Sequence, residues 1–275
     1  MIPRHVIDHQ GGELHLLAQG LEARDTPALL LLHQVPSSGW MWREVMSRLP
    51  AGLACIAPDL PGYGESTPPR ATPSLEGFAD AALAGARALH PGPFVVVGHH
   101  TGALVALVSL AREPERVRGV LGLGLPWFAD WPSRFERFAR LSPMDPDADP
   151  GQLQALWTFT SQSFDSETPL ATRLRVFADR LAAGPCWYHG YVALYGYDVQ
   201  MLAGRLAGLR ERIDLVALEQ DRLSSCAGDA ERDLGVTVER MPGGPWVTVE
   251  RPGAVAERLL GAYRRFCSAA AHASG

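Results

Sequence analysis

Lysine is absent from this chain of 275 residues, so all 25 of its basic residues are arginines. A Schiff-base nucleophile and the phosphate-binding loop of nucleotide hydrolases both need a lysine, and both kinds of site are therefore excluded. Cysteine is scarce as well. The four cysteines, at positions 55, 186, 226 and 267, lack the paired spacing of a zinc site and are expected to be free thiols.

Long apolar runs and basic patches are also missing. No apolar stretch approaches the roughly 20 residues that span a bilayer. The N-terminus shows no basic segment followed by a long apolar one. The net charge of -5, without any run of basic residues, argues against a nucleic-acid partner. We therefore expect a cytoplasmic protein with neither membrane nor nucleic acid as a partner, and its oligomeric state stays open.

What the sequence has is an alternation of short apolar segments and amphipathic ones. A hairpin is expected at residues 6–8 and 13–18, further strands at 28–32, 53–57, 94–97, 117–123, 213–218 and 236–241, and helices at 40–49, 75–89, 103–112 and 253–266. Alternating strands and helices need crossover connections, which predicts an α/β fold with a mostly parallel central sheet and helices on both faces. The small and polar tail, residues 268–275, is expected to fray.

The alternation stops near residue 126 and resumes only at residue 213. The segment between is rich in aromatic residues, loops and helical patterns. We interpret residues 1–126 and 206–275 as one core domain, and residues 127–205 as an inserted, mainly helical cap.

One turn stands out between a β-branched strand and a helix: Gly98-His99-His100-Thr101-Gly102. Small residues at both ends of such a turn let strand and helix approach closely, while the middle residue projects at the top of the sheet. The turn resembles the nucleophile elbow of the α/β-hydrolase superfamily.

Four other segments resemble landmarks of that superfamily and occur in the same order. Residues 33–38 resemble the His-Gly loop after the third strand, and residues 58–66 resemble its Asp-x-x-Gly-x-Gly-x-Ser segment. Residues 215–221 resemble the strand that delivers the catalytic acid, and residues 241–252 the final loop. The likeness covers nearly the whole chain outside the cap and is greatest to the capped epoxide-hydrolase and dehalogenase branch. It implies an α/β-hydrolase fold.

Three departures from the family pattern bear on function. The nucleophile position holds His100, where hydrolysis needs Ser, Asp or Cys. The position of the usual catalytic histidine, before Trp246, holds Pro245, and Gln34 replaces a glycine of the oxyanion loop. The acid position keeps its carboxylate, Asp221. An acyl-enzyme mechanism needs a nucleophile, a base and a group that orients the base. Only the last is present, so serine ester hydrolysis is not expected.

The lost imidazole of the final loop has a counterpart at the elbow. A histidine is longer than a serine and projects toward the space that the missing loop histidine leaves, so we expect His100 to hydrogen-bond Asp221 as a His–Asp dyad. The N-terminus of the following helix opposes an imidazolium and favours a neutral base. The resemblance further implies an oxyanion hole from the backbone N–H groups of Val35 and Thr101, since backbone donors do not depend on side-chain identity. A plain helix-cap role for Asp221 remains an alternative.

A base beside an oxyanion hole suits proton abstraction next to a carbonyl, as in elimination, cyclisation or isomerisation without a cofactor. Some α/β-hydrolase-like proteins of polyketide pathways perform such chemistry. Two other interpretations stay open. His100 could activate water in a hydrolase, or the protein could bind a small molecule without catalysis. A metal site made of His33, His99 and His100 is not expected, because the adjacent His99 and His100 should diverge.

Six residues are candidates for contact with a small-molecule substrate: Gln34, Trp127, Tyr188, Tyr191, Tyr195 and Trp246. The tyrosines at 188, 191 and 195 have helical spacing and would share one face of a helix, as ordinary core residues also do. As a group these residues favour an apolar or aromatic substrate.

Overall fold

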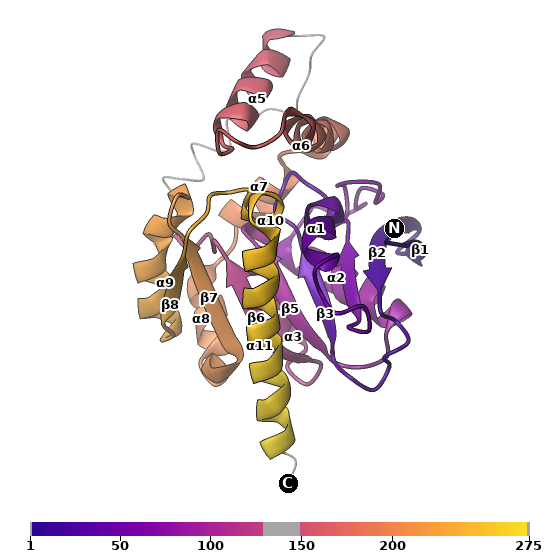
Figure 1. The fold of residues 1–275 in the computed structure, drawn as a ribbon, viewed down its shortest axis with the longest axis vertical. Coiled ribbons are helices and arrows are strands. Elements are labelled where there is room, and N and C mark those ends of the chain that lie inside the picture. The colour runs from indigo at the N-terminus through magenta and orange to yellow at the C-terminus, as the bar shows by residue number, and fades with distance from the viewer. Residues whose placement is uncertain (1, 129–148, 274–275) are drawn as a thin grey trace.

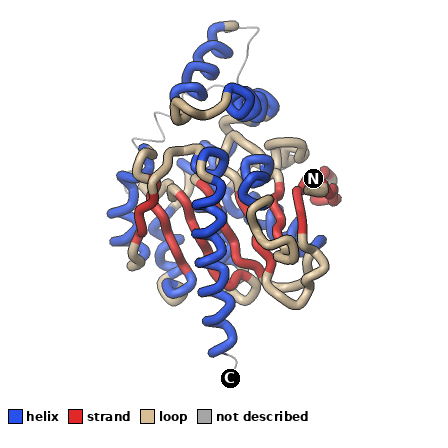
Figure 2. Tube along the Cα trace, in the orientation of Figure 1, coloured by secondary structure: helices blue, strands red, loops and turns tan. Residues whose placement is uncertain are grey.

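An eight-stranded sheet forms the centre of the computed structural model, which describes residues 2–128 and 149–273 (Figures 1 and 2). Its strands are β1 (Arg4–His9), β2 (Gly12–Gln19), β3 (Ala28–Leu32), β4 (Cys55–Pro58), β5 (Phe94–His99), β6 (Val117–Leu123), β7 (Ile213–Leu218) and β8 (Val238–Met241). They are ordered β1-β2-β4-β3-β5-β6-β7-β8. β2 pairs antiparallel with β1 and β4, and the pairs from β4 to β8 are parallel. The predicted mostly parallel sheet is confirmed.

Helices cover both faces of this sheet. The helices are α1 (Arg43–Met46), α2 (Leu75–Leu89), α3 (Thr101–Arg112), α5 (Gly151–Gln162), α6 (Leu170–Ala182), α7 (His189–Tyr195), α8 (Val199–Leu206), α9 (Ala227–Leu234), α10 (Val247–Glu250) and α11 (Pro252–Ala273). The 3-10 turns are η1 (Gly39–Trp42), η2 (Gly184–Cys186), η3 (Arg210–Arg212) and η4 (Arg222–Cys226). Residues of α1, α10 and α11 pack into one core, and residues of α2, α3, α8 and α9 into the other (Figure 1).

The side chains of β3 show why the strand is apolar throughout. Leu29 and Leu31 belong to the core beneath α1 and α11, whereas Leu30 and Leu32 belong to the core beneath α2 and α3. Successive side chains of a strand point to opposite faces, so a strand covered on both sides needs a continuous apolar run. All four leucines are fully buried.

Two local expectations were wrong. The single helix expected at residues 40–49 is the 3-10 turn η1 followed by the one-turn α1, and the Ser38 hydroxyl accepts a hydrogen bond from the Trp40 N–H at the start of η1. At the other end of the chain, α11 continues to Ala273, so residues 268–273 are helical rather than frayed. The alanines of this segment have the highest helix propensity of all residues and extend the helix.

Between β6 and β7 the chain leaves the sheet and returns to it. α5 and α6 lie beyond the carboxyl ends of the parallel strands (Figure 1). α7 contacts α2 and α3, and α8 contacts α3. The expected cap, residues 127–205, includes residues 129–148, which lie outside the described part, and its boundaries stay a prediction. In the described ranges no helix combines the length and apolarity that a membrane crossing requires.

Candidate active site

The turn between β5 and α3 holds His100 in a conformation that few residues adopt. His100 has φ +49° and ψ −118°, a backbone region costly for any residue with a Cβ. Its N–H donates to the Leu123 carbonyl at 2.9 Å, which ties the turn to β6. A Cβ on Gly98 would collide with the Gly102 carbonyl, and one on Gly102 with the Leu32 carbonyl, so both glycines are sterically required. The turn is therefore a strained elbow that projects His100 above the sheet.

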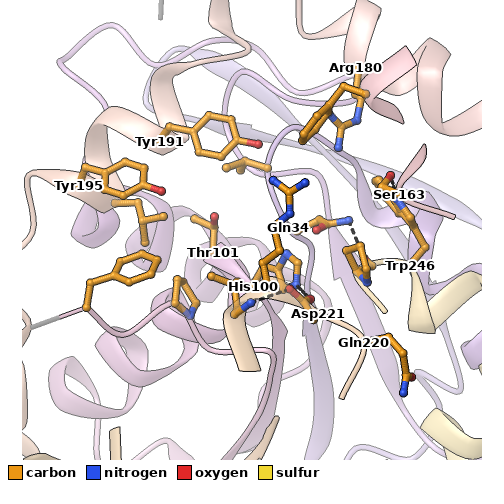
Figure 3. Close-up of a pocket in the computed structure, with 18 of the residues that line it drawn as sticks. Gln34, His100, Thr101, Ser163, Arg180, Tyr191, Tyr195, Gln220, Asp221 and Trp246 are labelled. Atoms are coloured by element: carbon orange, nitrogen blue, oxygen red, sulfur yellow. Dashed lines mark hydrogen bonds and ion pairs between the residues drawn. The ribbon is translucent and has the colours of Figure 1, made fainter. Parts of the chain in front are cut away.

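His100 and Asp221 are directly hydrogen-bonded, with 2.5 Å between His100 Nε2 and Asp221 Oδ2 (Figure 3). The other carboxylate oxygen, Oδ1, accepts from the Leu223 N–H at 2.9 Å and caps η4. Asp221 thus performs both roles considered for it, as dyad partner and as helix cap. Burial raises the pKa of Asp221, but the charge of protonated His100 and the hydrogen bonds from His100 and Leu223 lower it by more, so that pKa lies below its ordinary value.

The dyad leaves one nitrogen of His100 for chemistry. An ionised carboxylate only accepts hydrogen bonds, so in the neutral imidazole the proton lies on Nε2, a tautomer assigned from the hydrogen bond. Nδ1 then carries the lone pair. His100 is also the N-cap residue of α3.

The ring of His99 stacks on that of His100, with 4.2 Å between ring centroids and 20° between planes. The expectation that these neighbours diverge was wrong, because the positive φ of His100 folds its side chain back. His99 is fully buried, and in the described part of the chain neither of its ring nitrogens has a hydrogen-bond partner. Burial lowers the pKa of His99 well below its ordinary value, so His99 is neutral and places no charge beneath His100.

A cavity of about 340 Å³ lies above the dyad. The sheet side contributes residues that follow the carboxyl ends of β3, β5, β6, β7 and β8, and α5, α6 and α7 contribute the opposite wall. Its lining comprises Gln34, Val35, His100, Thr101, Pro126, Phe128, Phe159, Gln162, Ser163, Arg180, Tyr191, Leu194, Tyr195, Gln220, Asp221, Arg222, Leu223, Pro245 and Trp246. Ligands of parallel α/β sheets bind at this edge of the sheet.

Most of the residues singled out from the sequence line this cavity, and two do not. Those that do are Gln34, Val35, His100, Thr101, Tyr191, Tyr195, Asp221 and Trp246. Trp127 is fully buried, with its indole N–H donating to Asp233 at 3.0 Å. Tyr188 precedes α7 and packs its ring against Trp187 and His189. Neither residue lines the cavity. For Tyr188 the helical spacing did not show which tyrosines would meet the cavity.

Comparison with known proteins agrees with this architecture. The sequence profile of the family described as alpha/beta hydrolase fold matches residues 27–200. The chain belongs to the α/β-hydrolase fold family.

Within this family the similarity is to its epoxide-hydrolase and dehalogenase-like branch. An epoxide hydrolase from Caballeronia sordidicola is 32% identical over 168 residues, which are 54% of this chain and 48% of that protein. A pimeloyl-[acyl-carrier protein] methyl ester esterase from Aromatoleum aromaticum is 39% identical over 98 residues, 36% of this chain and 37% of that protein. The chain therefore spans less than half the length of these curated relatives.

Solved structures extend the likeness of fold to nearly the whole chain. Epoxide hydrolase A from Mycobacterium thermoresistibile has a TM-score of 0.77 at 18% identity, covering 96% of this chain and 98% of that one. A haloalkane dehalogenase from Bradyrhizobium elkani has a TM-score of 0.75 at 22% identity, covering 98% of this chain and 100% of that one.

At the position of the family's loop histidine, Gln34, Ser163, Pro245 and Trp246 form one side of the cavity, which we call the wall. Hydrogen bonds connect these residues. The Gln34 amide donates to the Pro245 carbonyl at 3.2 Å, which joins two of the departures from the family pattern. Next to it, the buried Trp246 donates its indole N–H to the Ser163 hydroxyl at 2.7 Å. The wall therefore connects the final loop to the oxyanion loop and to the segment after α5.

Two residues expected to supply backbone donors lie at the same cavity. Val35 and Thr101 line it, and their N–H groups donate to no acceptor among residues 2–128 and 149–273. Unpaired N–H groups in such a position can stabilise a developing oxyanion.

Sequence reasoning missed Arg180, a buried residue of α6 that lines the cavity and lies 8% exposed. Its guanidinium lies over the rings of Phe159 and Trp246, with its Cζ at 5.4 and 5.3 Å from their centroids. Burial lowers its pKa. Nothing in the sequence distinguishes Arg180 from Arg173 and Arg175 of the same helix. Only the packing shows that Arg180 is the one that lines the cavity.

Proposed function

We propose that this α/β-hydrolase family member is a cofactor-independent enzyme that uses His100 and Asp221 for acid–base chemistry next to the carbonyl of a small molecule. The observation that carries the proposal is the His100–Asp221 hydrogen bond at the floor of a cavity lined by residues of both the sheet side and the α5–α7 side. The chemistry it favours is elimination, with cyclisation and isomerisation sharing the same first step.

The elimination uses groups that all line one cavity. Nδ1 of His100 takes a proton from the carbon next to the carbonyl, and the electron pair moves onto the carbonyl oxygen. The N–H groups of Val35 and Thr101 stabilise that oxyanion. The electron pair then returns, the bond to the leaving group on the next carbon breaks, and the imidazolium gives its proton to the departing oxygen. Asp221 stabilises the imidazolium between the two transfers.

The remaining lining fits an apolar or aromatic substrate body. Phe128 and Tyr195 stack with 5.9 Å between ring centroids, and Leu194 and Trp246 extend the apolar wall. Such surfaces bind hydrocarbon portions of a ligand, while a few polar groups fix its orientation.

A second candidate is hydrolysis by a water molecule that His100 activates. The names of the relatives favour it, since they include an epoxide hydrolase and a methyl ester esterase. The same dyad would serve, because a neutral imidazole can deprotonate water as well as carbon.

Turnover of a panel of β-acetoxy ketones and of p-nitrophenyl acetate, in water labelled with heavy oxygen, separates these possibilities. Elimination gives an enone and unlabelled acetate, whereas hydrolysis places label in the acetate. His100→Ala should abolish turnover and leave the circular dichroism spectrum unchanged. His189→Ala, which removes an imidazole outside the cavity lining, is the matched control. Binding of the ketones with full recovery, equal in wild type and His100→Ala, would instead indicate a non-catalytic binding protein.

A further inference from the structure

A buried cation faces the cavity without a counter-ion. Arg180 has no acidic side chain within ion-pair distance among the residues that the structure describes, and its Nε has no hydrogen-bond partner. The neighbouring carboxylate, Asp179, is not available to it. Asp179 instead pairs with Arg175 at 2.9 Å and accepts a hydrogen bond from the Ser38 hydroxyl at 2.7 Å. Tyr191 interacts electrostatically with Arg180, but no carboxylate in the described ranges neutralises the charge of the arginine.

An unpaired buried charge is unfavourable for the folded protein, because it has lost its hydration without gaining an opposite charge. The rings of Phe159 and Trp246 offset part of this loss through cation–π contact. They provide no hydrogen-bond acceptor for the guanidinium N–H groups. A group that lines the substrate cavity in this state is complementary to an anion that arrives with the substrate.

The lining supports an anionic ligand in a second way. Its other arginine, Arg222, is exposed at the cavity and has no ion-pair partner within the described ranges. The carboxylate of the lining, Asp221, is engaged by His100 and Leu223. The free charges of the described lining are thus positive.

We propose that Arg180 binds a carboxylate group of the substrate. A guanidinium presents parallel N–H donors that match the two oxygens of a carboxylate, and this geometry gives strong charge-assisted hydrogen bonds. A single buried guanidinium neutralises one negative charge, which suits a carboxylate rather than a phosphate dianion.

The position of Arg180 also sets how the substrate lies. Arg180 enters from α6, across the cavity from His100 (Figure 3). A carboxylate held there directs the other end of the molecule to the dyad and to the backbone donors. This assignment rests on the proposed function, and the substrate class becomes an acid that carries its reacting carbonyl at the opposite end, such as a keto acid or a β-acyloxy keto acid.

Calorimetric titration with hydrocinnamate and its neutral analogue hydrocinnamide tests the proposal. The two probes share the aromatic body and differ in charge. Wild-type protein should bind the carboxylate at least about tenfold more tightly than the amide, the ratio expected for one charge-assisted pair. Arg180→Gln should remove the preference for the carboxylate over the amide. Arg180→Lys keeps the positive charge but lacks the paired N–H donors of a guanidinium, so it should retain part of that preference. Arg264→Gln, which removes an exposed arginine of α11 outside the cavity lining, is the matched control and should keep the preference.

An equal affinity for both probes in wild type, or a preference that survives Arg180→Gln or disappears with Arg264→Gln, would overturn the proposal. Tighter binding of phenylphosphonate than of hydrocinnamate would overturn the choice of carboxylate. Thermal unfolding checks the fold, and loss of an unpaired buried cation should not lower the midpoint of Arg180→Gln. The preference should persist in His100→Ala. If the preference for hydrocinnamate is missing in wild type while His100→Ala still abolishes turnover, only the assignment of Arg180 as the carboxylate-binding residue fails. If the preference for hydrocinnamate is present but the wild-type protein shows no turnover, the proposed acid–base chemistry fails.

Discussion

Acidification should destabilise the folded protein through His33, the buried histidine of the oxyanion loop. His33 is fully buried, and both of its ring nitrogens are used. Nδ1–H donates to the Gln34 carbonyl at 2.7 Å, and Nε2 accepts from the Leu60 N–H at 2.8 Å. A second proton would break the bond from Leu60 and place a charge in the core. Burial accordingly lowers the pKa of His33 to about 4.

The sign and size of the effect follow from that value. Between pH 6.5 and about 4 the unfolded chain binds a proton at His33 that the folded chain does not, so the free energy of unfolding falls as the pH falls. From about pH 7 to about pH 5 the loss is about 2 kcal/mol, at 1.36 kcal/mol per pH unit below the unfolded pKa. The lowered pKa of the buried His99 acts in the same direction.

Urea unfolding, followed by tryptophan fluorescence at about pH 7 and about pH 5, measures this difference. His33→Asn can keep a donor for the Gln34 carbonyl but cannot titrate. It should be less stable than wild type at pH 7, yet its loss on acidification should be smaller by about 2 kcal/mol. His9→Asn, on the edge strand β1, should leave the wild-type difference unchanged. A His33→Asn protein with the full wild-type pH dependence would refute the reasoning.

Three further predictions concern the dyad and its elbow. Gly124→Ala should reduce turnover, because a Cβ there would lie 2.8 Å from Cδ2 of His100 and displace the ring, and it should also lower stability, because Gly124 has φ +59°. A kinetic assay beside a thermal melt checks both. Asp221→Asn should lower kcat by about 10³ to 10⁴, since an amide no longer fixes the tautomer, whereas its oxygen can still cap Leu223; a drop under tenfold would argue against the dyad. Gly102→Ala should yield little folded protein, because its Cβ would collide with the Leu32 carbonyl, and the soluble fraction on expression measures it.

The parts of the fold that could be predicted depend on local patterns. The strand Ala28–Leu32 and the helix Leu75–Leu89 have the bounds expected from their sequences, because a doubly buried strand and an amphipathic helix both carry strong periodicity. The elbow could be located because its glycines are sterically required. The short α1 could not, since its length is set by packing rather than by a pattern.

The same distinction holds for the site. His100 and Asp221 could be paired in advance, because the order of the family's landmarks fixes which strand ends meet. Arg180 could not be recognised, because nothing in the sequence of α6 shows which of its arginines lacks a carboxylate. Trp127 was a plausible aromatic contact for the substrate, and only its hydrogen bond to Asp233 shows that it belongs to the core.

The hydrogen bond between Gln34 and Pro245 has a consequence for engineering an acyl-enzyme into this site. Replacement of His100 by serine would supply a nucleophile with no imidazole to activate it. Replacement of Pro245 by histidine would give two imidazoles competing for one carboxylate, and would alter the loop that Gln34 holds. Neither single substitution supplies both a nucleophile and an imidazole to activate it, so an acyl-enzyme mechanism would require changes on both sides of the hydrogen bond between Gln34 and Pro245.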